Sequence, residues 1–459
     1  MQISIENIKL MNNRYIHIHN KMIKYRRKIR NCGGYMENKE RCLLVAVQLP
    51  NEDEYDIEEL GLLVEAADGI VISSITQNRQ GIDNRFYAGQ GKIEEIAAYV
   101  KELEIDTVVF NDELSGSQIR NIEEAVDAKV IDRTNLILDI FAKRALTKEG
   151  QLQVELAQLK YSLPRLIGLN KNLSRLGGGI GTRGPGEQKL ELDRRRIKEK
   201  INDIQNELND LEKVRETKRK KRMKDQVPVI SIVGYTNAGK STLLNALVES
   251  EYSEEEAENK KVFAHDMLFA TLDTELRRVR LPGGRRVVFS DTVGFIKKLP
   301  TQIVEAFKGT LEEIKYADLI IHLIDINDEN LQLHKETTAK LVEKIVDKDI
   351  PVLTVYNKID KIINDKVTTV STNDIIYISA KNKFNMDLLL NTVDTKINGE
   401  KHKYSLKIPN KDIKEYYWLY ENRYTENVEF DGEGANLNAV LYDNEKEQYK
   451  KYITGEVNG

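Results

Sequence analysis

The sequence predicts a multidomain α/β protein that ends in a small α+β domain. Three observations favour this fold class. Short apolar runs alternate with helix-spaced apolar residues over 43–140, two stretches in 149–224 repeat leucine or isoleucine at heptad spacing, and a β-branched run at 229–233 leads through a glycine loop into an apolar-periodic helix. These patterns predict an N-terminal parallel α/β domain, a long antiparallel helical hairpin and a doubly wound P-loop domain. We expect the parts to span 1–40 (a basic extension), 41–148 (the N-terminal domain), 149–225 (the hairpin), 226–400 (the P-loop domain) and 401–459 (the C-terminal domain).

The first 35 residues are basic, as in KMIKYRRKIRN, and lack the long apolar core of a secretory signal. Met36 is followed by ENKERCLLVAV, which has the character of a natural start of translation. We therefore expect translation to begin at Met36, which leaves the upstream extension untranslated. A start at Met1 is the alternative.

Strands alternating with helices indicate βαβ units in 41–148. The helical segments carry apolar residues at steps of three and four, namely Ile57, Leu60, Leu63, Val64 and Ala67, and then Ile93, Ile96, Val100 and Leu103. The sequence GQGK at 89–92 is rich in glycine and opens a helix, but it lacks the longer spacing of a phosphate-binding loop. A turn or packing role is favoured there, and a second nucleotide site is the alternative.

Two heptad seams predict the helical hairpin. Their members are Leu152, Leu156, Leu159, Leu163 and Leu166 in the first segment and Ile197, Ile201, Ile204, Leu208 and Leu211 in the second. Pro164 should end or kink the first helix because it lacks a backbone donor. The tip at 174–189 is glycine-rich and carries Arg175, Arg183 and Lys189, so it is either a flexible connector or a probe for folded RNA. The basic run at 215–224 is either a solvated helix end or a set of phosphate contacts.

The segment GYTNAGKS predicts a phosphate-binding loop. Gly234 and Gly239 allow successive backbone N–H groups to approach phosphate oxygens, and the N-terminus of the next helix adds partial positive charge. We expect Lys240 to reach the β- and γ-phosphates and the Ser241 hydroxyl to bind Mg²⁺. The loop residues assigned to the site are Gly234, Tyr235, Thr236, Asn237, Ala238, Gly239, Lys240 and Ser241.

Three further motifs each end a predicted strand, and together they favour GTP over ATP. Asp291 is placed near the Mg²⁺ ion, and the Gly294 N–H can donate to the γ-phosphate. The Asp360 carboxylate can accept two hydrogen bonds that guanine donates and adenine cannot, while the Ala380 N–H can donate to the guanine O6. The residues of these motifs are Asp291, Thr292, Val293 and Gly294, then Asn357, Lys358, Ile359 and Asp360, and lastly Ser379, Ala380 and Lys381.

A switch segment is expected between the phosphate loop and Asp291. The Thr271 hydroxyl would join the Mg²⁺ ligands only when a γ-phosphate is present, and an ordinary strand threonine is the alternative. Asp291 would act on the Mg²⁺ ion indirectly. The segment consists of Phe269, Ala270, Thr271, Leu272 and Asp273. Phe295 stands where small GTPases carry a glutamine that orients the attacking water. No catalytic side chain is therefore assigned, and the backbone of Gly294 and Thr271 is the remaining candidate.

The chain resembles the HflX-type GTPases of the Obg–HflX group over residues 41–450. The resemblance lies in YAGQGKIEEI, IDRTNLILDIFAKRALTKEGQLQVELAQL, GGGIGTRGPGE, FATLDT, LPGG and DTVGFIKKLPTQIVEAFKGTLEE. It implies a cytoplasmic GTPase that binds the large ribosomal subunit and its RNA and splits idle or stalled ribosomes under stress. The hairpin tip would reach toward the peptidyl-transferase region. Because Phe295 cannot position the attacking water, we expect slow hydrolysis by the isolated protein and stimulation by its ribosomal partner. A large-subunit assembly or hibernation factor, in which GTP only regulates binding, is the alternative.

Composition narrows the remaining possibilities. A net charge of −4 gives no general attraction to nucleic acid, so RNA affinity must come from local patches and no DNA binding is expected. Cys32 and Cys42 indicate neither a disulfide framework nor a zinc site, and the six histidines show no metal-ligand spacing. No apolar run reaches membrane-spanning length. We expect a cytoplasmic monomer.

Two segments are less informative. The C-terminal helix carries Tyr416, Tyr417, Trp418 and Tyr420, which we expect in a core rather than on a binding face. The acidic segment 249–261 precedes the switch and is interpreted as a solvated loop, with slowed nucleotide exchange or local repulsion of RNA as alternatives.

Overall fold

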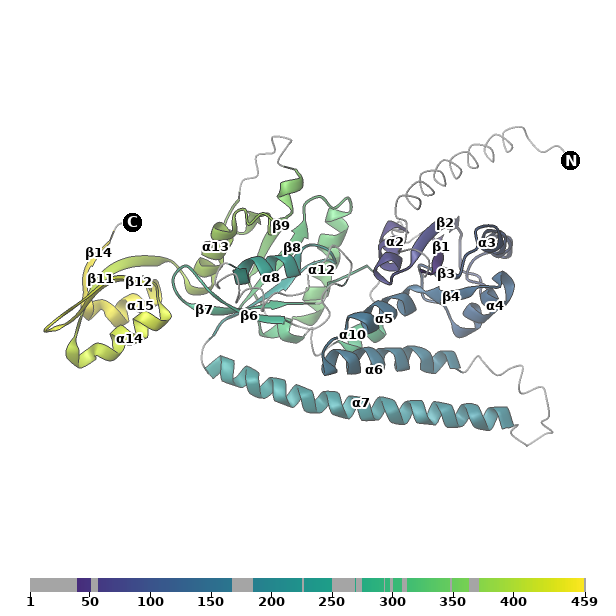
Figure 1. Ribbon diagram of the computed structural model, residues 1–459, viewed down its shortest axis with the longest axis horizontal. Coiled ribbons are helices and arrows are strands. Elements are labelled where there is room, and N and C mark those ends of the chain that lie inside the picture. The colour runs from purple at the N-terminus through teal and green to yellow at the C-terminus, as the bar shows by residue number, and fades with distance from the viewer. Residues whose placement is uncertain are drawn as a thin grey trace. The chain divides into compact units, whose positions relative to one another are not determined.

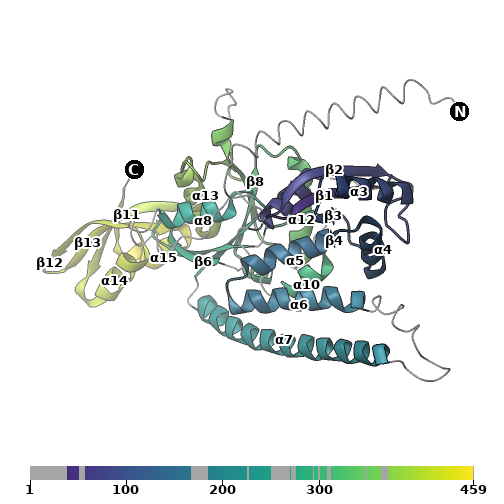
Figure 2. The ribbon, with the colours of Figure 1, turned by 45° about the vertical axis from the view of Figure 1, so that its right-hand side comes forward.

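The computed structural model describes residues 39–50, 57–166, 185–224, 227–249, 269, 275–292, 294–297, 300–307, 312–346, 349–362 and 371–457 (Figures 1 and 2). The chain forms two compact units. The first consists of the residues up to Leu114 together with Gln118–Asp132, and the second of Ser115–Ser117 together with Arg133 onward. The start at Met36 and Cys32 lie outside the described residues.

The first unit is built around a parallel sheet with the strand order β2-β1-β3-β4. The elements of this part of the chain are β1 (Arg41–Gln48), α2 (Ile57–Ala66), β2 (Ile70–Asn78), α3 (Gln90–Glu102), β3 (Thr107–Phe110), α4 (Gly116–Val126) and β4 (Lys129–Asp132). Side chains from β1, α3 and β3, including Val45, Ile96 and Val108, are buried in one core. The parallel α/β fold predicted here is confirmed.

The second unit begins with three helices, α5 (Arg133–Arg144), α6 (Lys148–Arg165) and α7 (Pro185–Lys224). The Thr147 hydroxyl caps α6 by accepting the Gly150 N–H at 3.0 Å. Helix α6 ends one residue after Pro164. Helices α6 and α7 lie side by side, as Figures 1 and 2 show, and ion pairs join them. These pairs are Lys148–Glu207, Glu155–Lys200 and Glu149–Arg215.

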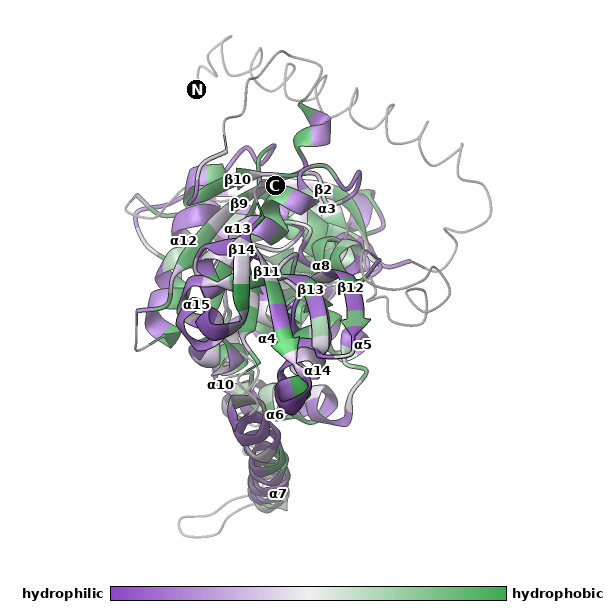
Figure 3. Cartoon of the chain, turned by 90° about the vertical axis from the view of Figure 1, so that its left-hand side faces the viewer, coloured by the Kyte–Doolittle hydropathy of each residue, from purple (hydrophilic) through white to green (hydrophobic). Residues whose placement is uncertain are grey.

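The buried face of α6 differs from the predicted leucine seam. Leu152, Leu159 and Leu163 are only partly buried, whereas the buried residues of the helix include Gln153, Val154, Leu156, Ala157 and Tyr161. The difference arises because α6 packs against α5 and α10 as well as α7, so its core face is wider than a two-helix seam. On α7 only Ile204 of the predicted seam is fully buried, and Figure 3 shows a mainly hydrophilic helix.

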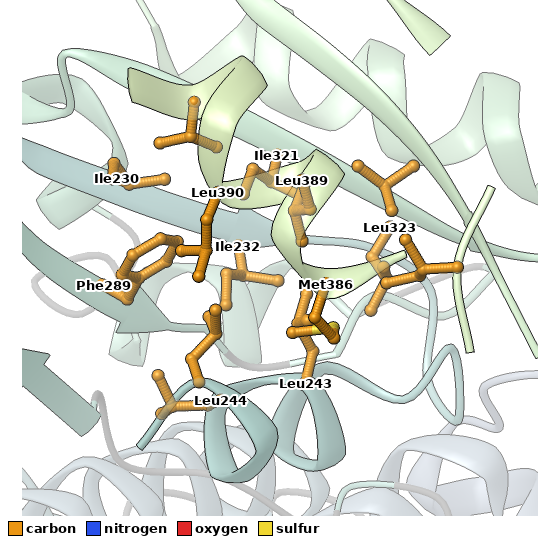
Figure 4. Close-up of a cluster of buried hydrophobic side chains, with 14 of the residues drawn as sticks. Ile230, Ile232, Leu243, Leu244, Phe289, Ile321, Leu323, Met386, Leu389 and Leu390 are labelled. Atoms are coloured by element: carbon orange, nitrogen blue, oxygen red, sulfur yellow. The ribbon is translucent and has the colours of Figure 1, made fainter. Parts of the chain in front are cut away.

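The P-loop domain has a six-stranded sheet with the order β10-β9-β8-β5-β7-β6, in which only β6 is antiparallel to its neighbour. Its elements are β5 (Val229–Val233), α8 (Lys240–Glu249), β6 (Glu275–Arg280), β7 (Arg286–Asp291), α10 (Thr301–Ala306), η2 (Glu312–Tyr316), β8 (Leu319–Asp325), α12 (Leu331–Ile345), β9 (Val352–Asn357), η3 (Ile359–Lys361), β10 (Ile375–Tyr377) and α13 (Met386–Asn398). Figure 4 shows Leu243 and Leu244 of α8 and Leu389 and Leu390 of α13 packed against one face of this sheet. The predicted open, mainly parallel sheet is confirmed.

The C-terminal part is a small antiparallel sheet with short helices, in the order β12-β13-β11-β14. Its elements are β11 (Lys401–Pro409), η5 (Asn410–Asp412), α14 (Ile413–Asn422), β12 (Thr425–Asp431), β13 (Gly434–Tyr442), α15 (Asp443–Tyr449), η6 (Lys450–Tyr452) and β14 (Ile453–Glu456). The predicted α+β fold is confirmed.

The placement of the C-terminal aromatics in a core was wrong for three of four residues. Tyr416 is buried, but Tyr417, Trp418 and Tyr420 are 57%, 41% and 56% exposed. The reason is that α14 is covered on one face only, where Tyr416 and Leu419 meet the sheet.

Candidate functional site

The loop between β5 and α8 has a backbone that requires its glycines. Gly239 has φ +93° and Asn237 has φ +61°, both in the left-handed region. A Cβ at Gly234 would collide with the carbonyl oxygen of Leu323, and one at Gly239 would collide with the side-chain amide of Asn357. The loop therefore lies against β8 and β9 with no room for larger residues.

Lys240 is held inside this loop. Its ammonium group donates to the carbonyl oxygens of Gly234 at 3.1 Å and Tyr235 at 2.9 Å, and the side chain is buried. Burial lowers the pKa of Lys240 to about 8, although the Asp291 carboxylate favours the charged form. A buried cation at a helix N-terminus beside a row of backbone amides is suited to bind an anion.

Ser241, in the first turn of α8, meets Asp291 at the carboxyl end of β7. The Ser241 hydroxyl donates to Asp291 Oδ2 at 2.9 Å, and both residues are buried. Next to them, the Thr292 hydroxyl donates to the Ile232 carbonyl at 2.8 Å and so fixes the start of the following segment. Carboxylate and hydroxyl oxygens are ligands that suit Mg²⁺, so the donor set fits the ion expected here.

The motifs predicted for base recognition converge around Asn357. Its side-chain amide donates to the Ala238 carbonyl at 2.9 Å, and its Oδ1 accepts the Ala380 N–H at 3.0 Å. The Ser379 hydroxyl donates to Asp360 Oδ1 at 2.6 Å and holds this carboxylate beside Ala380. Asn357 thus ties the phosphate loop to the segment expected to face guanine. Ile359 is buried in the core, and Lys381 is exposed.

The sequence motifs did not predict two polar residues of this region. Asp325 ends β8 and pairs with Lys358 Nζ at 3.0 Å, while the Asn327 side chain donates to the Lys358 carbonyl at 2.9 Å. Lys358 also reaches Asn237 Oδ1 at 3.3 Å across the phosphate loop and has φ +65°. The position of Asp325 at the carboxyl end of a central strand was a usable signal, because ligands of such sheets bind there.

The phosphate loop is also bonded to the segment after Gly294. The Thr236 N–H donates to the Phe295 carbonyl at 2.8 Å, and the Phe295 N–H donates to the Gly234 carbonyl at 3.2 Å. The hydroxyl of Tyr235 accepts the Lys297 N–H at 2.7 Å. These three bonds hold Gly294 against the loop.

A histidine that sequence spacing did not single out supports Tyr235. The His334 ring stacks on Tyr235 with centroids 3.6 Å apart and planes 9° apart. His334 Nδ1 lies 2.5 Å from Asp328 Oδ2, which fixes the ring, and this interaction contributes to a lowered pKa of Asp328. No sequence motif predicts the contact with Tyr235, because His334 and Asp328 both come from the β8–α12 region, which is far from Tyr235 in the chain.

Several predicted residues lie outside the described part of the chain. They are Ala270, Thr271, Leu272, Asp273, Val293, Arg175 and Arg183, the acidic stretch beyond Glu249, and the side chain of Lys189. Phe269 is described, is 2% exposed and contacts Phe141. Cys42 is a buried free thiol, and burial raises its pKa to about 11. Among the described helices, none combines the length and apolar character needed to cross a membrane.

Three family models match successive parts of the chain. The model for the GTP-binding GTPase N-terminal region matches residues 54–142, the middle-region model matches 144–222, and the model described as 50S ribosome-binding GTPase matches 229–358.

Curated relatives that match this chain over most of their length share one family name. GTPase HflX of Caldanaerobacter subterraneus subsp. tengcongensis is 47% identical over 91% of this chain and 94% of its own. GTPase HflX of Escherichia coli is 40% identical over 81% of this chain and 86% of its own. A solved structure of a GTP-binding protein from Sulfolobus solfataricus with GDP is 27% identical over 78% of this chain and 98% of its own, with a TM-score of 0.41. The chain therefore belongs to the HflX family, and it is a GTP-binding protein that hydrolyses GTP.

Proposed function

We propose that this chain is a Mg²⁺-dependent GTPase of the cytoplasm that binds the large ribosomal subunit and its RNA as a monomer. In this proposal, the GTP-bound state drives the α6–α7 hairpin into the ribosome and separates the subunits of idle or stalled ribosomes under stress. Support for the partner comes from the match of residues 229–358 to a model described as a 50S ribosome-binding GTPase. No DNA partner is proposed.

The observation that carries the proposal is an aromatic junction between α5 and two segments next to the nucleotide site. The ring of Phe141 lies 4.7 Å from that of Phe269 and 5.1 Å from that of Phe307, both in edge-on arrangements. All three rings are at most 2% exposed. Phe269 precedes the proposed switch Thr271 by two residues, and Phe307 follows α10 of the second switch region. Close-packed interiors transmit small shifts, so movement of either segment should displace α5.

Polar contacts attach all three helices to the second switch region and the segment that follows it. On α5, the Arg133 guanidinium donates to the Lys297 carbonyl at 3.0 Å. On α6, Lys160 Nζ pairs with Glu305 of α10 at 3.1 Å. On α7, Arg219 pairs with Glu313 at 2.7 Å and lies 3.7 Å from the centre of the Tyr316 ring. The hairpin is therefore bonded to the segment 297–313, where a nucleotide switch would act.

The basic residues of α7 fall into two groups, one paired within the protein and one exposed. Arg215 and Arg219 are engaged within the protein, with Glu149 and Glu313 respectively. Lys218, Lys220 and Lys221 are exposed. We assign phosphate contacts with ribosomal RNA to these lysines and to Arg175, Arg183 and Lys189 of the tip, which would make binding salt-dependent.

Within the nucleotide site, we assign the phosphates to the residues of the loop from Gly234 to Ser241, and the guanine base to Asp360 and the Ala380 N–H. Ser241, Thr271 and, indirectly, Asp291 would hold Mg²⁺, which neutralises charge on the phosphates when bound. The buried Phe295 cannot polarise water, so hydrolysis by the free protein should be slow and the large subunit should stimulate it.

The first test measures GTP hydrolysis with and without purified large subunits, using Lys240→Ala as the blank. Strong stimulation supports the proposed partner, and a rate that ignores the subunits contradicts it. A splitting assay with a non-hydrolysable GTP analogue then separates two mechanisms. Splitting with the analogue but not with GDP assigns the work to GTP binding and release to hydrolysis. No splitting with any nucleotide would favour an assembly or hibernation factor.

Two variants test the coupling and the tip. Phe141→Ala should retain GTP binding but lose splitting, because the contact between α5 and the switch flanks is gone. Phe141→Leu keeps an apolar side chain there and serves as the matched control. Deletion of 175–186 should also spare GTP binding and abolish splitting; survival of splitting would show that the tip is not the RNA probe.

A further inference from the structure

The side chain that follows Gly294 points away from the nucleotide loop. Phe295 is 1% exposed and packs with Val233 and Ile320 in a separate cluster. The neighbouring strand residues Ile232 and Ile321 belong instead to the core beneath α8. Because successive strand residues face opposite sides, the Phe295 ring lies on the face of the sheet opposite α8. Another group must hold the attacking water.

The backbone at this position lies directly against the loop. Bonds between Thr236 and Phe295 and between Phe295 and Gly234 fix it there, at 2.8 Å and 3.2 Å. A Cβ built on Gly294 would lie 2.8 Å from Thr236 Cγ2 and 3.1 Å from Lys240 Nζ. Thr236 and Lys240 therefore border the same small space in front of Gly294, where the proposed γ-phosphate is expected.

Thr236 carries an unused hydroxyl on the same Cβ as the methyl group that faces Gly294, so a change of its χ1 rotamer brings the hydroxyl to this space. The residue is 7% exposed, and its Oγ1 is buried without a hydrogen-bond partner. Ser231, Ser290 and Thr338 share this condition, but within the described residues Thr236 is the one that belongs to the glycine loop. Buried hydroxyls are nearly always hydrogen-bonded, so an unused one at a ligand site indicates that the ligand completes it.

We propose that Thr236 is a catalytic residue of GTP hydrolysis and that its hydroxyl oxygen accepts a hydrogen bond from the attacking water. The inference rests on the proposed seating of the γ-phosphate between Lys240 and the Gly294 N–H. Thr236 thereby supplies the orientation that a glutamine at position 295 would supply in other GTPases.

The reaction itself is ordinary phosphoryl transfer to water. The water oxygen forms a bond to the γ-phosphorus, and the bond between that phosphorus and the β–γ bridging oxygen breaks. The bridging oxygen keeps the electron pair and leaves as part of GDP, while the water proton passes to a γ-phosphate oxygen of the inorganic phosphate product. Thr236 neither gains nor loses a proton and contributes alignment alone.

The test compares Thr236→Val, which removes the hydroxyl at constant shape, with Thr236→Ser, which keeps it. Single-turnover hydrolysis at saturating GTP and Mg²⁺ should fall about 10- to 100-fold in the valine variant and stay within about threefold of the parent in the serine variant. Affinity for a fluorescent non-hydrolysable GTP analogue should change less than about threefold in both. Thr338→Val removes a buried unpartnered hydroxyl from α12 and should hydrolyse GTP at the parental rate.

A parental rate in Thr236→Val would overturn the assignment. If the valine variant fails to bind nucleotide, Thr236→Ala and Thr236→Ser decide the question, because both shed the methyl group and only serine keeps the oxygen. Equal rates in that pair would exclude a role for the hydroxyl. Loss of analogue binding in Lys240→Ala checks the seating of GTP separately, so failure of the underlying site is distinguishable from failure of this inference.

Discussion

The segments at the starts of α8 and α3 both combine glycines with a lysine, as GYTNAGKS and GQGK, and both belong to parts built on mainly parallel sheets. Their backbones differ. Gly239 has φ +93° and no room for a Cβ, whereas Gly89 has φ −70° and Gly91 has nothing within 4 Å of a built Cβ. Lys240 is buried among loop carbonyls, while Lys92 contacts Glu95 on the surface of α3 at 2.5 Å.

Glycine content alone therefore does not make an anion site. The loop before α8 keeps its shape because two neighbouring strands pack against it. The contacts are made by the Leu323 carbonyl of β8 and the Asn357 side chain of β9. At the start of α3, the Gly89 N–H already donates to Gln77 Oε1 at 2.9 Å, so a side chain of the protein itself occupies that donor. We therefore favour a turn role for GQGK.

The largest expected effect separates the two lysines. Lys240→Ala should weaken GTP binding by about 100-fold or more, because at least two charge-assisted hydrogen bonds to phosphate are lost. Lys92→Ala should leave the affinity unchanged. Isothermal titration with GDP and GTP measures both, and an equal loss in the two variants would mean that the turn before α3 also binds nucleotide.

Base recognition gives the next effect. Asp360→Asn should lower GTP affinity by about 100-fold and raise that for xanthosine triphosphate, because the new amide donates where the carboxylate accepted. Competition between the two nucleotides reports the change. Unchanged preference for GTP would remove Asp360 from the guanine site.

The glycines themselves provide a stability test of the comparison. Gly239→Ala should destabilise the protein by about 1–2 kcal/mol or more, since alanine is strained at positive φ and its Cβ would meet Asn357. Gly91→Ala lies in the first turn of α3 and should be neutral or stabilising by up to about 1 kcal/mol. Urea unfolding of the two variants decides, and a loss of stability in Gly91→Ala would show that the first turn of α3 is as constrained as the loop.

The smallest effect is a pH dependence that only the loop should show. In the nucleotide-free protein, burial lowers the pKa of Lys240 to about 8. Bound phosphates favour the charged lysine, so nucleotide binding above pH 8 should take up a proton. Affinity should be flat below pH 8 and fall by at most about tenfold per pH unit above it. The unliganded fold should gain stability as pH rises from 8, because the unfolded lysine then holds more protons. Proton uptake is measured by calorimetry in two buffers, and equal heats at pH 9 would contradict it.

Much of the fold and site was predictable because it is local. The strand-loop-helix of residues 229–249 follows from its β-branched run, glycines and apolar period, and Asp291, Asn357 and Ser379 each follow or end a recognisable strand. The heptad rule was less successful on α6, since it assumes one partner helix and α6 has three neighbours. The aromatic helix α14 failed for the opposite reason, because its outer face is uncovered.

The P-loop fold, the family and the identity of the nucleotide can be read from the sequence, since these depend on residue types at short, fixed spacings. The distant residues that complete the site are brought together by tertiary packing. Asn357 meets Ala238 across 119 residues, Arg133 meets Lys297 across 164, and His334 stacks on Tyr235. Tertiary packing also brings Phe141 against Phe269 and Phe307 and leaves the Thr236 hydroxyl without a partner. Such contacts leave no periodic trace in the chain, because they arise where separate elements pack together.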